Sequence, residues 1–124
     1  MSSSAKKGAS RVGGVMTSFA KLGFRCARTS ASGQRRGARQ GENMIAGDLI
    51  ALAPVDSGFP HVIIEVGGVG KVVTAAFDEL LEFPLPPGFI AMVIRFVKRK
   101  RRYYLDADSR FESLTEALEA SREA

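Results

Sequence analysis

Two carboxylates stand at the edges of apolar stretches that are predicted to be strands. Asp48 opens the stretch that ends before Pro54, and Glu65 lies near the end of the β-branched stretch 61–66. If these strands are adjacent and antiparallel, the start of one lies beside the end of the other, so the carboxylates meet. Close carboxylates repel each other unless a cation lies between them, and oxygen ligands favour Mg²⁺, which can activate a phosphodiester towards hydrolysis. The alternative is two unrelated, solvated acids, and the spacing alone favours neither.

The first third of the chain is strongly basic. Nine of the 18 Lys and Arg residues and none of the 13 acids lie in residues 1–41, which therefore carry +9, whereas residues 42–124 carry −4 and the whole chain +5. Such a segment indicates a polyanionic partner, most simply nucleic acid. An Arg- and Ser-rich stretch without acids also fits an organellar transit peptide, or a solvated basic arm. A second basic run, residues 98–102, is predicted as a hairpin turn that either contacts phosphates or is simply solvated.

Apolar spacing, glycines and prolines predict an α/β chain in the order helix, three strands, helix, two strands, helix. The helices are predicted over residues 12–22, 73–83 and 109–122, and the strands over 24–28, 48–53, 61–66, 89–97 and 103–105. Gly23 is predicted to terminate the first helix. The length suits one domain, so residues 1–6 are expected to be a flexible basic tail and residues 7–124 a single domain.

An ordered set of short motifs covers residues 7–71, about half of the chain. The set is Lys7-Gly8, a helix, Leu22-Gly23-Phe24, Arg28-Thr29-Ser30-Ala31-Ser32-Gly33 with arginines after it, Asp48-Leu49-Ile50-Ala51-Leu52 and Val62-Ile63-Ile64-Glu65-Val66. In this order and spacing the motifs resemble the archaeal-type Holliday-junction resolvases and related phage and bacterial nucleases of the PD-(D/E)XK superfamily. The resemblance implies a restriction-endonuclease-like fold, in which helices flank a mixed central sheet. It also implies a homodimer that hydrolyses branched or double-stranded DNA with Mg²⁺.

The resemblance assigns roles to individual residues. Asp48 and Glu65 match the metal carboxylates, and Ser32 matches a loop serine near the scissile phosphate. The positions expected to contact DNA are Lys7, Arg28, Ser30, Ser32, Arg35, Arg36 and Arg39.

Two positions depart from the family pattern. Val12 stands where the family has a helix glutamate, and Gly67 stands where it has a lysine that helps to stabilise developing charge. Lys71 is expected to replace that lysine from the glycine-rich segment, and Glu42 to replace the helix acid. The alternative is a catalytically inactive DNA-binding protein that has retained the nuclease fold.

The remaining chemistry-bearing residues receive structural interpretations. Cys26 is the one cysteine, so no disulfide forms within the chain, and a reducing, cytoplasmic setting of prokaryotic, phage or archaeal type is expected. Cys26 is predicted to be a small buried residue, and His61 to be a strand-start residue rather than a catalytic base. No apolar run approaches the roughly 20 residues of a membrane helix, so no membrane partner is expected.

Overall fold

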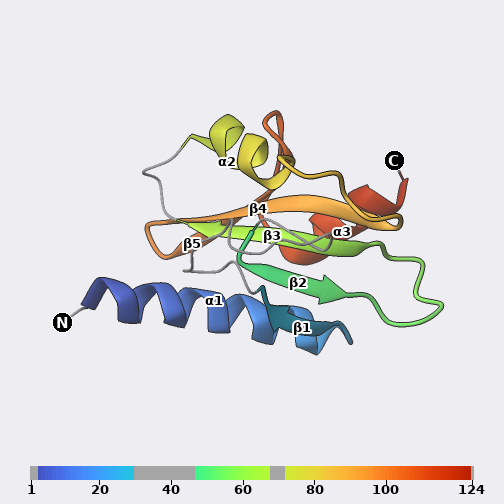
Figure 1. Cartoon of the computed structure of the whole chain (residues 1–124). Coiled ribbons are helices and arrows are strands. Elements are labelled where there is room, and N and C mark those ends of the chain that lie inside the picture. The colour runs from blue at the N-terminus through green and yellow to red at the C-terminus, as the bar shows by residue number, and fades with distance from the viewer. Residues whose placement is uncertain (1–2, 30–46, 68–71, 124) are drawn as a thin grey trace.

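The computed structural model describes residues 3–29, 47–67 and 72–123, with side chains from residue 11 to residue 122 of those ranges (Figure 1). Within them the helices are α1 (Ser3–Lys21), α2 (Val73–Leu80) and α3 (Leu114–Glu123). The strands are β1 (Arg25–Arg28), β2 (Leu49–Leu52), β3 (His61–Gly67), β4 (Phe89–Val97), β5 (Lys100–Asp106) and β6 (Ser109–Phe111). The predicted α/β class is confirmed, with one more short strand than the sequence predicts.

The strands form one mixed sheet in the order β1 to β6. Neighbouring strands pair antiparallel except β3 and β4, which are parallel. Parallel strands need a crossover connection, and α2 lies in it. One end of the sheet therefore gathers the ends of β1, β3 and β4 and the starts of β2 and β5. We call it the Glu65 end.

Helices cover both faces of the sheet. Core contacts place α1 and α3 on one face and α2 on the other, and Figure 1 shows α1 and α2 on opposite sides. In β3, Val62 and Ile64 point to the α1/α3 side and Ile63 points to the α2 side, and all three are buried. Because β3 is buried on both faces, it lies at the centre of the core. Burying each side chain of this size contributes about 1.5–3 kcal/mol to the stability of the fold. Among the described residues, no helix combines the length and apolarity needed to cross a bilayer.

A Schellman motif ends α1. The Phe24 N–H donates to the Phe19 carbonyl at 3.1 Å, and the Gly23 N–H donates to the Ala20 carbonyl at 3.0 Å. Gly23 has a φ of +93°, which glycine adopts without strain. The rings of Phe19 and Phe24 pack edge to face with centroids 5.1 Å apart, the apolar contact that accompanies this motif. The predicted role of Gly23 is confirmed.

The β4–β5 hairpin is fixed to α1 through one aromatic ring. The guanidinium carbons of Arg11 and Arg101 lie 5.3 Å and 5.4 Å from the centroid of the Phe96 ring. Arg101 Nη1 also donates to Ser18 Oγ at 2.7 Å. A Cβ atom at Gly14 would lie 2.9 Å from Arg101 Nη2, so the glycine that weakens this helix admits the arginine.

The last helix begins later than the sequence predicts. Residue 109 was expected to start the helix but instead begins β6, which pairs with β5. Asp106 Oδ1 accepts the N–H of Asp108 at 2.8 Å, a local turn that reverses the chain. Ser113 Oγ accepts the N–H of Glu116 at 3.1 Å, which caps α3. The prediction of a helix from residue 109 is therefore wrong, and the Ser-x-x-Glu pattern marks the observed start.

The basic run at residues 98–102 is mostly strand rather than turn. Val97 pairs with Lys100, so the turn consists of Lys98 and Arg99 alone. These two residues have φ values of +51° and +71°. A two-residue hairpin with positive φ at both positions favours Asn-Gly, so the lysine and arginine occupy it at a cost in stability.

Replacing Lys98 by Asn and Arg99 by Gly together should raise the free energy of unfolding by about 1 kcal/mol, because both new residues tolerate positive φ. Urea unfolding of the variant and the wild type measures the change. A matched Lys98→Gln, Arg99→Gln variant removes the same charges without relieving the backbone, and it should show no such gain. Equal gains in both variants would mean that charge repulsion, and not backbone strain, destabilises the turn.

Candidate functional site

Asp48 and Glu65 lie next to each other at the end of the β2–β3 ladder. The last paired residues are Leu49 and Ile64 in antiparallel register, and Asp48 and Glu65 are the next position of each strand. The Asp48 N–H donates to the Ile64 carbonyl at 2.8 Å, and Asp48 Oδ2 accepts the N–H of Val66 at 2.9 Å. The two strands are therefore adjacent and antiparallel, the condition under which the sequence analysis expects the carboxylates to meet. One carboxylate oxygen of Asp48 closes the ladder, which is a structural role in its own right.

Two residues that the sequence analysis did not select hold the backbone of Asp48. The buried Thr29 donates from Oγ1 to the Gly47 carbonyl at 2.6 Å, and its N–H donates to the Asp48 carbonyl at 3.2 Å. Gly47 has a φ of +99°, and a Cβ atom there would lie 2.8 Å from Leu80 Cδ2 and 3.0 Å from the Ile64 carbonyl oxygen. A side chain at residue 47 would therefore displace either α2 or β3.

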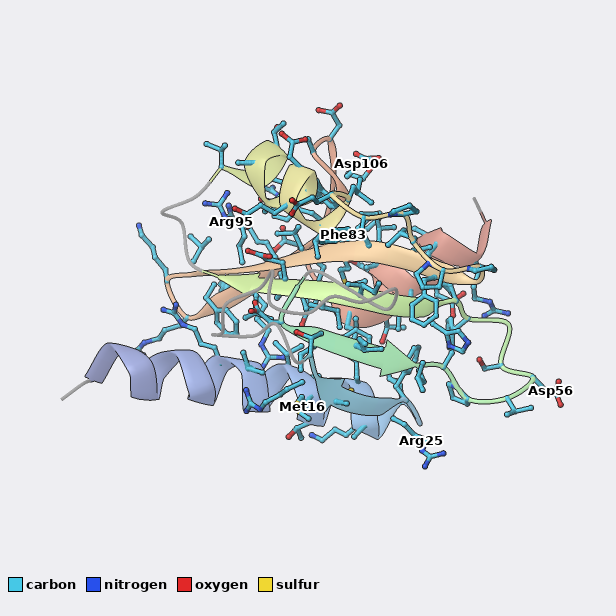
Figure 2. All side chains as sticks on the ribbon, in the orientation of Figure 1. Met16, Arg25, Asp56, Phe83, Arg95 and Asp106 are labelled. Carbon is cyan, nitrogen blue, oxygen red and sulfur yellow. The ribbon has the colours of Figure 1, made fainter. Side chains whose placement is uncertain are left out.

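Charged residues cross the Glu65 end from β1 to β5, two carboxylates between arginines. In strand order they are Arg28, Asp48, Glu65, Arg95 and Arg102. Arg28 is exposed at the end of β1, and Figure 2 shows Arg95 on the α2 side of the sheet near the end of β4. On the α2 side the available chemistry is a carboxylate pair with the two arginines of β4 and β5 beside it, whereas Arg28, paired with Leu49, leaves the opposite face. The sequence analysis did not select Arg95, although period-two alternation would have placed it on one face with Val93.

The carboxylate pair suits a magnesium ion. Mg²⁺ is usually held by one or two carboxylates together with waters and substrate phosphates, and Asp48 keeps its second oxygen outside the bond to Val66. Within the described ranges there is no group of three or more His, Cys, Asp or Glu residues that could hold a metal ion. The pair therefore fits an ion that keeps much of its water, and it does not form an all-protein metal cage.

Several predicted site residues lie outside the described residues. These are Ser30, Ser32, Arg35, Arg36, Arg39, Lys71 and the substitute acid Glu42. Lys7 lies in α1, but its side chain is also outside the described part. Of the two departures from the family pattern, Val12 is buried in the core and Gly67 ends β3. The roles of the residues that are not described stay predictions.

His61 and Cys26 have local structural partners. His61 Nδ1 accepts the N–H of Ala53 at 2.9 Å, and its ring packs against Phe89 with centroids 4.9 Å apart, as expected for a strand-start residue. Cys26 is half-buried against the core, and its thiol lies 3.9 Å from the Met16 carbonyl oxygen. Burial raises the pKa of the Cys26 thiol above its ordinary value, which makes it a weak nucleophile at neutral pH.

An apolar groove of about 600 Å³ lies away from these charges. Its lining comes from α2, the start of β4, the turn between β5 and β6, and the C-terminal half of α3, and includes Phe77, Leu81, Phe89 and Phe111. None of the predicted site residues lines it. The groove offers apolar contacts but not the charged groups of the Glu65 end.

Replacing Thr29 by Val should lower the free energy of unfolding by about 1 kcal/mol, because the hydroxyl donor is lost while side-chain volume is retained. Thr29→Ser keeps the donor and should stay close to the wild type. Urea denaturation of the wild type and the two variants measures the three free energies of unfolding. A serine variant as unstable as the valine variant would show that the methyl group, and not the bond to Gly47, stabilises the junction.

The Cys26 thiol should react slowly with iodoacetamide at neutral pH compared with a free cysteine peptide, because its raised pKa leaves little thiolate. The rate should keep rising with pH beyond the range where the peptide levels off, and unfolding in urea should restore peptide-like reactivity. Mass spectrometry of timed samples follows the reaction. A folded-state rate equal to that of the peptide at neutral pH would contradict this prediction.

No protein-family model matches the chain, and no curated protein matches it. The function is therefore inferred from the residues at the Glu65 end and from the motif pattern of the sequence. Those residues are carboxylates and guanidinium groups, the side chains that metal-assisted phosphodiester chemistry employs.

Proposed function

We propose that this chain is a divergent Mg²⁺-dependent endodeoxyribonuclease that acts as a homodimer on branched DNA of the Holliday-junction type. The observation that carries the proposal is the position of Asp48 and Glu65, one step beyond the last pair of two antiparallel strands. The basic first third and the arginines at the Glu65 end suit a DNA backbone. The motif pattern over residues 7–71 supports the specific likeness to resolvases.

The chain's own residues perform three tasks in this proposal. Thr29 and Gly47 fix the backbone at Asp48, and the Val66 N–H holds one of its carboxylate oxygens, so the side chain is restrained. Arg28 adds positive charge for a DNA strand at the exposed edge of the sheet. When bound by Asp48 and Glu65, Mg²⁺ supplies a Lewis acid that polarises the phosphodiester. Ser32 and Lys71 keep their predicted roles near the scissile phosphate.

A second candidate function is DNA binding without cleavage. Val12 is 9% exposed and packs in the core cluster, so α1 places no carboxylate at that position. Gly67 places no cation two residues after Glu65. A protein that kept the fold and the basic surface but lost these two groups would bind DNA and leave it intact.

Asp48→Asn should abolish cleavage, by at least about 100-fold, while leaving the fold unchanged. The amide oxygen still accepts the Val66 N–H, but the charge that holds the metal is gone, and metal-derived charge stabilisation is worth several kcal/mol. Labelled four-way junction, linear duplex and single-stranded DNA are incubated with Mg²⁺ or EDTA, and products are separated on denaturing gels.

Asp56→Asn is the matched control, because Asp56 is an exposed turn residue far from Arg95 in Figure 2 and has a φ of +65°, which asparagine tolerates. It should cleave like the wild type. Cleavage that persists in EDTA or in Asp48→Asn would rule out the proposed site. Salt-sensitive binding without cleavage by the wild type would favour the second candidate, and no binding would contradict both.

A further inference from the structure

Two arginines face each other across the β4–β5 ladder at the Glu65 end. Arg95 is the direct partner of Arg102 in the antiparallel register, so both side chains leave the same face of the sheet. Val93 and Tyr104 form the pair two residues away on that face, where both pack in the α2 cluster. Like charges that are directly opposed destabilise a strand pair. The register therefore places two guanidinium-bearing side chains side by side on this face.

The Arg102 side chain is also incompletely satisfied. Its Nε atom is buried and has no hydrogen-bond acceptor among the residues that the structure describes. Native proteins rarely keep a buried donor without an acceptor unless it has another role. Phosphate oxygens match guanidinium groups well, because the planar fork can donate two parallel hydrogen bonds to them.

The described residues leave space for such an anion beside Arg95. The parallel β3–β4 register pairs Arg95 with Gly67, which has no side chain. A Cβ atom added at Gly67 would meet no heavy atom of the described residues within 4 Å, so none of them fills this part of the face. Gly67 lies two residues, about 7 Å, beyond Glu65 on the same strand and the same face. This space therefore adjoins the carboxylate pair.

We propose that Arg95 and Arg102 bind a phosphate group of the nucleic-acid backbone immediately beside the Asp48–Glu65 pair. This inference rests on the proposed function, since it takes nucleic acid as the ligand. The guanidinium groups offset the charge of the phosphate, whereas the nearby carboxylates repel it until a cation neutralises them. Binding of the phosphate and of Mg²⁺ at this end should therefore strengthen each other.

The test measures the salt dependence of DNA binding. Fluorescence anisotropy with a labelled duplex and a labelled four-way junction, in EDTA and over a series of NaCl concentrations, compares the wild type with Arg95→Gln, Arg102→Gln and the double variant. Because the two arginines share one phosphate, the double change should reduce the slope of log K against log [NaCl] by about one, and each single change should reduce it by no more than that. Arg122→Gln is the matched control and should leave the slope unchanged, because Arg122 of α3 lies over the Phe59 ring, before the start of β3 and away from the Glu65 end.

Thermal unfolding accompanies each binding curve. The Arg102→Gln protein should melt at or above the wild-type temperature, because it loses an opposed and unsatisfied charge, and a lowered slope in a stable variant supports the site. Unchanged slopes in both single variants and in the double variant, or an equal fall in Arg122→Gln, would overturn it. If the wild type binds and cleaves DNA and the arginine variants keep its salt slope, only this inference is refuted. If the wild type binds no DNA, the proposed function is refuted as well.

Discussion

The end of the β2–β3 ladder is the constraint on which the Glu65 end depends. The chain enters β2 through Gly47, where Leu80 of α2 and the Ile64 carbonyl leave no room for a Cβ atom. The path into β2 is therefore fixed by the packing of α2 over the sheet. From that path the Asp48 carboxylate reaches the Val66 N–H and closes the ladder. The position of the Asp48 carboxylate thus depends on how α2 packs against β3. A shift of α2 would therefore move the carboxylate pair.

The β4–β5 hairpin contains several features that lower the stability of the fold. Lys98 and Arg99 occupy positive φ, at about 1–2 kcal/mol for a non-glycine residue. Opposition of Arg95 and Arg102 costs up to about 1 kcal/mol, and an unsatisfied buried donor costs about 1–3 kcal/mol. Asn-Gly in the turn and one neutral partner in the ladder would avoid these costs. The β4–β5 hairpin nevertheless carries a lysine and arginines at these positions. This composition suits selection for positive charge at this end of the sheet rather than for stability.

The sequence predicts the elements whose boundaries are set locally. The stretch 89–97, apolar except for Arg95 and preceded by Pro and Gly, coincides with β4, and Gly23 ends α1 as expected. The neighbourhood of Asp48 and Glu65 also follows, because a short connection favours antiparallel pairing of consecutive strands. The short strand β6 was missed because three half-polar residues carry no clear alternation.

The missed site residues depend on non-local geometry. The role of Thr29 depends on the carbonyl of Gly47, 18 residues away in sequence. The opposition of Arg95 and Arg102 depends on which residues form the turn. Residues 98–102 are all basic, so their sequence does not show where the turn ends and β5 begins.

The two departures from the resolvase pattern have opposite physical settings. Val12 is buried in apolar surroundings, so an acid there would lose its hydration without gaining a partner from the core. Gly67 instead borders space that no described residue fills, and its neighbour in the sheet is Arg95. Adjacent strands lie about 4.8 Å apart, and an arginine side chain is longer than that spacing. In the proposed site a cation beside Glu65 therefore does not require a lysine at residue 67, because Arg95 of the neighbouring strand provides one in addition to Lys71.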